Sequence, residues 1–224
     1  MQRSKVYFTN LRTKVGVSQL DKLEKLIRAA GIGEIDFDHK MVAIKIHFGE
    51  PGNLTYLRPN YAKRVADVIK SLGGIPFLTD CNTLYPGRRK NALEHIESAY
   101  ENGFSPFSTG CQVIIADGLK GDDDVEVPVR GGEYVKEAKI GRAVMDADIV
   151  VSLNHFKGHE MTGFGGAIKN IGMGCGSRRG KMEQHADGKP EVDQDLCVGC
   201  RFCAKQCAQS AISYPENKAV LDHD

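Results

Sequence analysis

Short apolar runs alternate with helical spacing along most of the chain. Strands are predicted at residues 42–48, 75–79, 112–116 and 149–153, where β-branched and other apolar residues cluster. Helices are predicted at residues 18–30, 59–72, 88–102 and 141–146. Strands that alternate with helices are typical of a parallel sheet covered by helices. The predicted fold class is therefore α/β, with a mostly parallel sheet and helices on both faces.

Two smaller features are predicted beside this sheet. Residues 6–9 are predicted as a weak first strand. Residues 125–129 and 134–138 predict a hairpin that turns at Gly131-Gly132. We expect this hairpin to be an insertion or an edge of the sheet.

The composition of the chain changes after residue 157. Residues 158–180 hold eight glycines and scarcely any β-branched residues, which predicts a system of loops. A polar linker follows at residues 178–190. We therefore expect an α/β domain with a Gly-rich ligand loop at residues 1–190 and a small α+β half-ferredoxin module at residues 191–224.

Length and charge exclude several classes of protein. At roughly 150 residues per domain, 224 residues correspond to one large domain with a small appendage. The 30 Lys and Arg residues nearly balance the 29 Asp and Glu residues, so a broad basic surface for nucleic acid is not expected. No apolar run approaches the roughly 20 residues that cross a bilayer, and the first residues lack the pattern of a secretory signal. We expect a cytoplasmic protein with no nucleic-acid partner and no membrane partner.

The cysteines carry the strongest chemical signal. Four of the seven lie within eleven residues, as Cys197-x-x-Cys200-x-x-Cys203-x-x-x-Cys207. This spacing matches the run that holds a [4Fe-4S] cluster, because two-residue gaps let successive thiolates surround one core. Zinc is the alternative metal, although zinc sites usually pair two knuckles across a longer gap. Clustered cysteines of odd total number also favour a reducing compartment over a disulfide framework.

The fourth ligand of this cluster stays open in the sequence. In ferredoxins with two clusters, the fourth cysteine of such a run binds the other cluster. These 224 residues contain no second run, so a second cluster would need a continuation of the chain or a partner that completes it. The first cluster could be closed by Cys207 or by a remote thiol such as Cys175.

Polar residues follow several of the predicted strands, at the edge where parallel sheets bind ligands. The residues expected to bind a ligand are Lys45, His47, Asn53, Asp80, Asn82, Gly163, Gly165, Gly166, Lys169 and Asn170. The residues expected to act in catalysis are His155, Lys157 and His159. Because separate parallel strands end on one side of the sheet, we expect a common cavity that holds a small anion and is surrounded by Lys45, His47, Asp80, Asn82, His155, Lys157, His159 and Lys169.

A bland interpretation of the same residues competes with this one. Asp80 and other polar residues after a strand are ordinary turn and helix-capping residues. Residues 163–170 offer bare backbone N–H groups that suit a phosphate or carboxylate, but they could equally be a tight glycine crossing. They match neither the dinucleotide-binding fingerprint nor the P-loop, so nucleotide binding by either device is poorly supported.

Long motifs in the chain resemble a known family. They are residues 42–53 (VAIKIHFGEPGN), residues 80–85 (DCNTLY) with Gly87-Arg-Arg, residues 155–159 (HFKGH) and residues 163–175 (GFGGAIKNIGMGC). These motifs resemble the iron–sulfur proteins of domain-of-unknown-function family 362. The resemblance implies an α/β domain fused to a ferredoxin-type module, which in relatives usually has two cysteine runs. This chain differs in lacking the second run and in having Ala208 where proline commonly follows the fourth cysteine. The family has no established reaction.

Three hypotheses about function follow. The first is an iron–sulfur redox protein, in the oxidoreductase class if it is an enzyme, whose cluster exchanges electrons with a small anionic ligand while a histidine supplies protons. The second is a non-enzymatic electron carrier or cluster-assembly partner that docks a redox partner protein. The third is a hydrolase or racemase-like enzyme that binds a metal through His47, His155 and His159 and keeps the cluster for structure.

Overall fold

The computed structural model describes residues 3–133, 135–185, 190–207 and 210–222. The helices are α1 (Gln19–Ala29), α2 (Pro59–Ser71), α3 (Ala92–Glu101), α4 (Pro106–Thr109), α5 (Arg142–Met145), α6 (Ala167–Gly172), α7 (Arg178–Gln184) and α8 (Phe202–Gln206), with short 3-10 turns η1 (Ile32–Glu34) and η2 (Pro215–Asn217). The strands are β1 (Met41–Lys45), β2 (Ile75–Asp80), β3 (Val113–Ile115), β4 (Asp124–Pro128), β5 (Glu137–Gly141), β6 (Ile149–Ser152), β7 (Lys157–His159), β8 (Gly163–Gly165), β9 (Ile212–Ser213) and β10 (Val220–Leu221).

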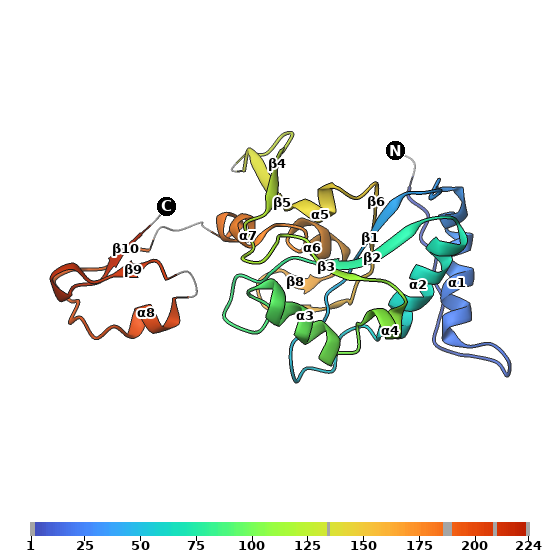
Figure 1. The fold of residues 1–224 in the computed structure, drawn as a ribbon, viewed down its shortest axis with the longest axis horizontal. Coiled ribbons are helices and arrows are strands. Elements are labelled where there is room, and N and C mark those ends of the chain that lie inside the picture. The colour runs from blue at the N-terminus through green and yellow to red at the C-terminus, as the bar shows by residue number, and fades with distance from the viewer. Residues whose placement is uncertain (1–2, 134, 186–189, 208–209, 223–224) are drawn as a thin grey trace.

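Four parallel strands form the central sheet, in the order β3-β2-β1-β6 (Figure 1). The chain passes from β1 to β2 and β3 on one side and later places β6 on the other side of β1. The strand order therefore reverses between β1 and β6, and such a switch point is where α/β sheets bind ligands. This architecture confirms the predicted α/β fold with a parallel sheet.

The core lies around β1 because this strand has a neighbour on each side. From Val42 to Lys45 every residue of β1 is buried. Helix α2 packs against β1 and β2 through an apolar face that includes Val65 and Ile69. Leu78 of β2 belongs to the same core. A strand, a crossover helix and a parallel strand thus form one packed unit, as the apolar pattern predicts.

Two predictions at the edges of the domain have different outcomes. The expected strand at residues 6–9 does not form: Val6 and Phe8 are both exposed, and none of the strands that the structure describes pairs with this segment. The hairpin is confirmed with shifted ends, since β4 and β5 pair in antiparallel fashion. Tyr134, within the predicted second strand of that hairpin, lies outside the described residues.

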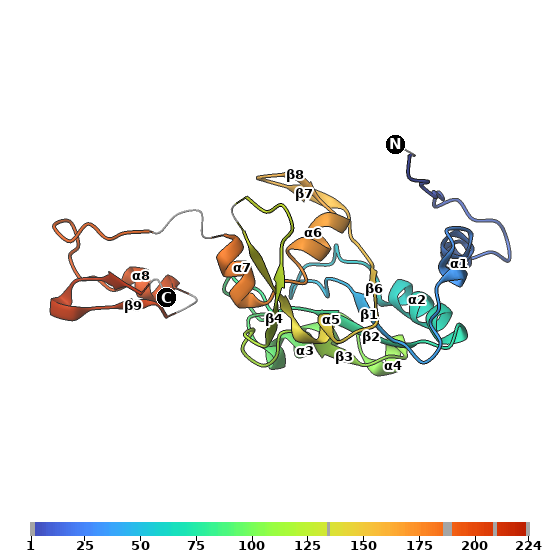
Figure 2. The same ribbon diagram turned by 90° about the horizontal axis from the view of Figure 1, so that it is seen from above.

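A second hairpin was not predicted. Strands β7 and β8 pair in antiparallel fashion directly before α6, within the Gly-rich stretch (Figure 2). The glycines that favour a loop also permit the tight turn, where Gly163 has a positive φ of 76°. Figure 2 shows this hairpin projecting from the body of the domain.

Residues 190–222 form a small unit with little apolar interior. It contains α8 and an antiparallel pair, β9 and β10. Among its described residues, Ala219 is the buried apolar side chain. The domain boundary near residue 190 stays a prediction, because residues 186–189 of the linker lie outside the described part of the chain. Ala208, which follows the fourth cysteine, also lies outside the described residues.

We expect the interior of β1 to dominate the stability of the α/β domain. Ile44 is fully buried, whereas Ile75 at the start of β2 is 57% exposed. Ile44→Ala should lower the free energy of unfolding by about 2–5 kcal/mol, because it removes buried methyl groups and leaves a cavity. The matched change Ile75→Ala should cost less than about 1 kcal/mol, since much of this side chain is already in solvent. Urea titrations of both variants would check this, and equal losses would show that β1 is not the centre of the core.

Candidate functional site

A buried ion pair joins the ends of β1 and β2. Lys45 is 1% exposed and Asp80 is 4% exposed, and Lys45 Nζ lies 2.9 Å from Asp80 Oδ1. Burying either charge alone would be costly, so each needs the other. The protein itself therefore supplies the counter-ion of Lys45, and this lysine does not need a bound anion.

Arg89 extends the pair into a cluster. The guanidinium is 2% exposed, and Nη1 lies 3.3 Å from Asp80 Oδ2. Its Nε donates to Glu50 Oε1 at 2.9 Å, and Tyr85 donates its hydroxyl proton to the same oxygen at 2.6 Å. Two cations, Lys45 and Arg89, thus balance two carboxylates at the edge of the sheet.

Asn170 ties helix α6 to this edge. Its Oδ1 accepts from Lys45 Nζ at 2.8 Å, while its Nδ2 donates to the Lys45 carbonyl at 3.1 Å and to Ser152 Oγ at 2.9 Å. Gly174 permits the close approach, because a Cβ there would lie 2.6 Å from Lys45 Nζ. One amide therefore links β1, β6 and α6 across the switch point.

Asn82 links Asp117 and His95 in a second buried polar cluster, next to the cluster of Lys45, Asp80 and Arg89. Its backbone N–H and its Nδ2 each donate to Asp117 Oδ1 at 2.9 Å. Its Oδ1 lies 3.3 Å from Nδ1 of His95, which is fully buried on α3. His95 Nε2 lies 3.8 Å from Asp80 Oδ2, so the two groups adjoin.

Burial and charge set the protonation of these groups. Burial would raise the pKa of Asp80, but Lys45 and Arg89 outweigh it and hold that pKa below its usual range. Burial lowers the pKa of His95 to about 3, against an opposing effect of Asp80. Burial also raises the pKa of Asp117, although backbone N–H donors oppose it. We therefore assign Asp80 as ionised and His95 as neutral near pH 7.

His47 belongs to an outer layer of the same edge. Its side chain is exposed, two residues beyond the end of β1, and its Nδ1 accepts from the Gly49 N–H at 2.9 Å. The surrounding protein lowers the pKa of His47, and Arg89 adds to this effect. The ring is thus accessible and is expected to be neutral.

The other two expected lysines lie on β7 and on α6. Lys157 and Lys169 are exposed, and Lys169 Nζ contacts His159 Nε2. Partial burial and the charge of Lys157 lower the pKa of Lys169. No described ion pair neutralises either lysine. Lys157 and Lys169 thus place positive charge beside the exposed side chains of Phe156 and Phe164, whose ring centroids lie 5.4 Å apart.

The remaining predicted residues have simpler surroundings. His155 is half-buried after β6. Asn53 Oδ1 accepts from the N–H and the hydroxyl of Thr55, which is a turn contact. Gly165 is buried and Gly166 precedes α6.

The predicted residues thus divide into a buried, charge-balanced cluster and an outer layer that reaches solvent. Lys45, Asp80, Asn82 and Asn170 contribute to the first, whereas His47, Lys157, His159 and Lys169 belong to the second. Their common use as one ligand site stays a prediction.

Sequence reasoning missed Arg89, Glu50 and Tyr85 as members of the cluster. Arg89 and Glu50 are 39 residues apart and come from loops without a regular pattern. The run from Asp80 to Arg89 did indicate that charged residues follow β2 directly. The sequence does not show that Arg89 pairs with Asp80 and Glu50.

The four cysteines of the 197–207 run lie at or near the surface of the C-terminal unit, whereas Cys81, Cys111 and Cys175 are buried in the α/β domain. Cys200 and Cys203 are exposed, and Cys197 and Cys207 are half-buried. Cys197 Sγ accepts from the Ala219 N–H at 3.3 Å, and backbone donors lower the pKa of this thiol. In the described ranges, no group of three or more His, Cys, Asp or Glu side chains is arranged to hold a metal ion. The cluster therefore remains a prediction, as does the His47, His155 and His159 site.

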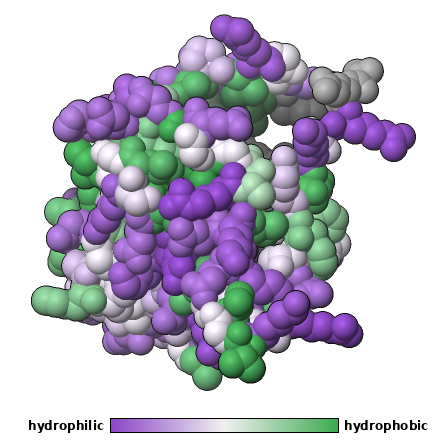
Figure 3. Space-filling model, turned by 90° about the vertical axis from the view of Figure 1, so that its right-hand side faces the viewer, coloured by the Kyte–Doolittle hydropathy of each residue, from purple (hydrophilic) through white to green (hydrophobic). Residues whose placement is uncertain are grey.

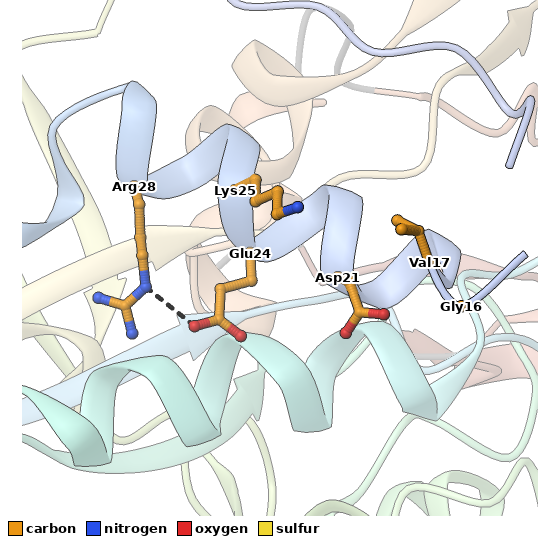
Figure 4. Close-up of a pocket in the computed structure, with 6 residues that line it drawn as sticks. All are labelled: Gly16, Val17, Asp21, Glu24, Lys25 and Arg28. Carbon is orange, nitrogen blue, oxygen red and sulfur yellow. Dashed lines mark hydrogen bonds and ion pairs between the residues drawn. The ribbon is translucent and has the colours of Figure 1, made fainter. Parts of the chain in front are cut away.

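A shallow groove lies beside α1, and none of the expected site residues lines it. It has a volume of about 300 Å³ and is lined by Gly16, Val17, Asp21, Glu24, Lys25 and Arg28 (Figure 4). Glu24 and Asp21 are both paired with arginines. Figure 3 shows that this side of the molecule is mostly hydrophilic. Because its carboxylates are already neutralised, the groove offers no obvious chemistry.

Comparisons with known proteins identify a family and distant relatives. A model of a domain of unknown function, DUF362, matches residues 42–215. A thylakoid-associated protein of Synechocystis sp. is 24% identical over 150 residues, which are 64% of this chain and 40% of that protein. The B subunit of the anaerobic dimethyl sulfoxide reductase of Escherichia coli is 40% identical over 42 residues, which are 19% of this chain and 20% of that subunit.

These matches are partial. The chain spans less than half the length of the curated relatives it matches. No solved structure matches. Of the helices that the structure describes, none is both long and apolar enough to cross a membrane.

We expect the buried lysine to matter far more than a surface lysine. Lys45→Ala should lower the free energy of unfolding by about 3–5 kcal/mol, because Asp80 would stay buried without its nearest cation. Lys63→Ala breaks an exposed pair with Asp67 and should cost about 0.3–0.5 kcal/mol. Denaturant unfolding of both variants at one ionic strength would measure the contrast. Similar losses would show that Lys45 and Asp80 are not coupled.

Acid should destabilise the protein through His95. A histidine in the unfolded chain has a pKa near 6.5, whereas burial lowers the pKa of His95 to about 3. Between these two pH values the unfolded state therefore binds a proton that the folded state does not bind. The contribution of neutral His95 to the free energy of unfolding is fully present above about pH 6.5. It is lost as the pH falls toward 3, with a limiting slope of about 1.4 kcal/mol per pH unit.

A matched pair of variants isolates this contribution. Between roughly pH 6.5 and pH 4.5, His95→Gln should reduce the pH dependence of the free energy of unfolding by the amount that corresponds to about one proton. Urea unfolding at several pH values would measure this dependence. His39→Asn changes a side chain in solvent and should leave the slope as it is. An unchanged slope in His95→Gln would mean that His95 is not held neutral by burial.

Proposed function

The chain belongs to the family defined by the domain of unknown function DUF362, and from this membership together with its cysteine run we propose that it is an iron–sulfur redox protein. The observation that carries the proposal is the spacing Cys197-x-x-Cys200-x-x-Cys203, with Cys207 as the fourth thiol. A bound [4Fe-4S] cluster would supply one-electron transfer. The partial similarity to a subunit of a reductase supports a redox role.

Several features of the C-terminal unit support this proposal. Such a short segment buries too little apolar surface to be stable alone, and small units usually need disulfides or a metal. All four of its cysteines are free. Cys200 and Cys203 are accessible, so a cluster could be inserted without opening a core. Gly199 is also required, since a Cβ there would lie 2.2 Å from the Asn217 carbonyl oxygen.

The α/β domain would bind a small anion on the outer layer of the strand ends. Lys157 of β7 and Lys169 of α6 supply positive charge and hydrogen-bond donors there, and neither lysine is engaged in a described ion pair. The buried cluster of Lys45, Asp80, Arg89 and Glu50 would hold the edge in shape rather than bind the anion. Electrons would then pass between the iron–sulfur cluster and the bound molecule or a redox partner.

A second candidate function is a non-enzymatic electron carrier that docks a redox partner protein. The exposure of Cys200 and Cys203 favours it, because an exposed cluster edge suits transfer between proteins. In either case a reducing compartment would keep the thiols available.

We expect iron and acid-labile sulfide in protein prepared without oxygen. Cys200→Ser should lose most of the bound iron, because it removes a thiolate from the shared run. Cys111→Ser, which changes a buried cysteine of the α/β core, should keep it. Metal analysis and EPR of reduced samples would measure both. Zinc without iron, or unchanged iron in Cys200→Ser, would contradict the proposal.

We expect inorganic phosphate to bind beside Lys157 of β7 and Lys169 of α6. Lys157→Gln and Lys169→Gln should each weaken binding about tenfold, since each removes a charge-assisted hydrogen bond worth about 1.4 kcal/mol. Lys63→Gln should leave the affinity unchanged, because Lys63 is already paired with Asp67. Calorimetric titration would measure the three affinities. Equal phosphate affinities of the three variants would rule out the surface around Lys157 and Lys169 as the anion site.

A further inference from the structure

His47 is held rigidly although its side chain is exposed. The residues on both sides of it, Ile46 and Phe48, are buried in the core. The Ile46 N–H donates to the Thr79 carbonyl at 3.1 Å, so pairing with β2 continues past the end of β1. His47 therefore projects from a fixed backbone beside the switch point between β1 and β6.

The hydrogen bond from Gly49 fixes the tautomer of the ring. A backbone N–H can only donate, so Nδ1 of His47 must offer a lone pair. A neutral imidazole then carries its proton on Nε2. Gly49 is suited to this task, because its φ is +90° and a Cβ would lie 2.5 Å from the Tyr56 ring.

The charges that face His47 do not favour a second proton. They are Arg89, Asp80, Lys45 and Glu50. The two cations balance the two carboxylates, so no net negative charge stabilises an imidazolium. Partial desolvation by the protein around the ring lowers the pKa of His47, and the charge of Arg89 lowers it further.

We infer that His47 contacts the ligand of the strand-end site as a neutral hydrogen-bond donor, presenting Nε2–H to a carbonyl or carboxylate oxygen. This inference rests on the proposed function, because it needs a ligand at that edge. A donor that keeps its proton polarises an acceptor oxygen without delivering a proton to it. The ligand class is therefore a small molecule with an accessible carbonyl or carboxylate group.

The tautomer can be measured on the full chain without any ligand. Long-range ¹H–¹⁵N spectra of labelled protein separate the two ring nitrogens of each histidine. His47→Asn assigns the signal by its disappearance, and the Asn Oδ1 can still accept from the Gly49 N–H. We expect Nε2 to be protonated and Nδ1 to be unprotonated from about pH 8 down to about pH 5, below the ordinary pKa of a histidine. A protonated Nδ1, or a doubly protonated ring near neutral pH, would overturn the inference.

Contact with a ligand is tested separately, with acetate as the probe. A saturable shift of the His47 Nε2 signal on acetate titration is expected in the native chain. His47→Gln keeps a hydrogen-bond donor and should bind acetate with an affinity within about threefold of the native chain. His47→Leu has no donor, and its acetate affinity should fall about tenfold. An Nε2 signal that does not move, or equal affinities in both variants, would overturn the inference. The iron content of the protein tests the proposed iron–sulfur function separately. A protein without iron would contradict that proposal but would leave the His47 ring signals and the acetate titration as they are.

Discussion

The ion pair between Lys45 and Asp80 is the interaction on which the carboxyl edge of the sheet depends. Both side chains are almost wholly buried, where a lone charge would be strongly destabilising and a pair is stable only with further hydrogen bonds. Arg89 and Asn170 supply those bonds from a loop and from α6. Because Asn170 also binds Ser152 at the end of β6, this pair helps to fix three strands and a helix at the switch point.

The balance of charge inside this edge shapes what its surface can do. The cations Lys45 and Arg89 are neutralised by Asp80 and Glu50, so the interior has no charge left for an anionic ligand. Positive charge without a described ion-pair partner lies further out, on the β7–β8 hairpin and α6. The neutral ring of His47 lies close to the buried charges and offers a donor. We therefore interpret the buried cluster as a support and the exposed layer as the place where a ligand would bind.

The sequence predicts the sheet better than it predicts the cluster. Apolar runs located β1, β2, β3 and β6 because each strand is short and bounded by turns, and the position of Lys45 and Asp80 at one edge follows from parallel pairing. Periodicity failed at residues 6–9, since Val6 and Phe8 favour a strand locally but find no partner strand. The contact between Arg89 and Glu50 joins two irregular loops, and no local pattern encodes such a pairing. The cysteine spacing predicts a [4Fe-4S] cluster, and this cofactor stays a prediction.

The most direct test of this account is a double-mutant cycle on the buried pair. The free energy of unfolding would be measured for the native chain, Lys45→Met, Asp80→Asn and the double variant under the same conditions. The account predicts that each single change is strongly destabilising and that the double variant loses far less than their sum, with a coupling energy of at least about 1.5 kcal/mol. Additive losses, with a coupling energy near zero, would contradict the claim that this pair organises the strand ends.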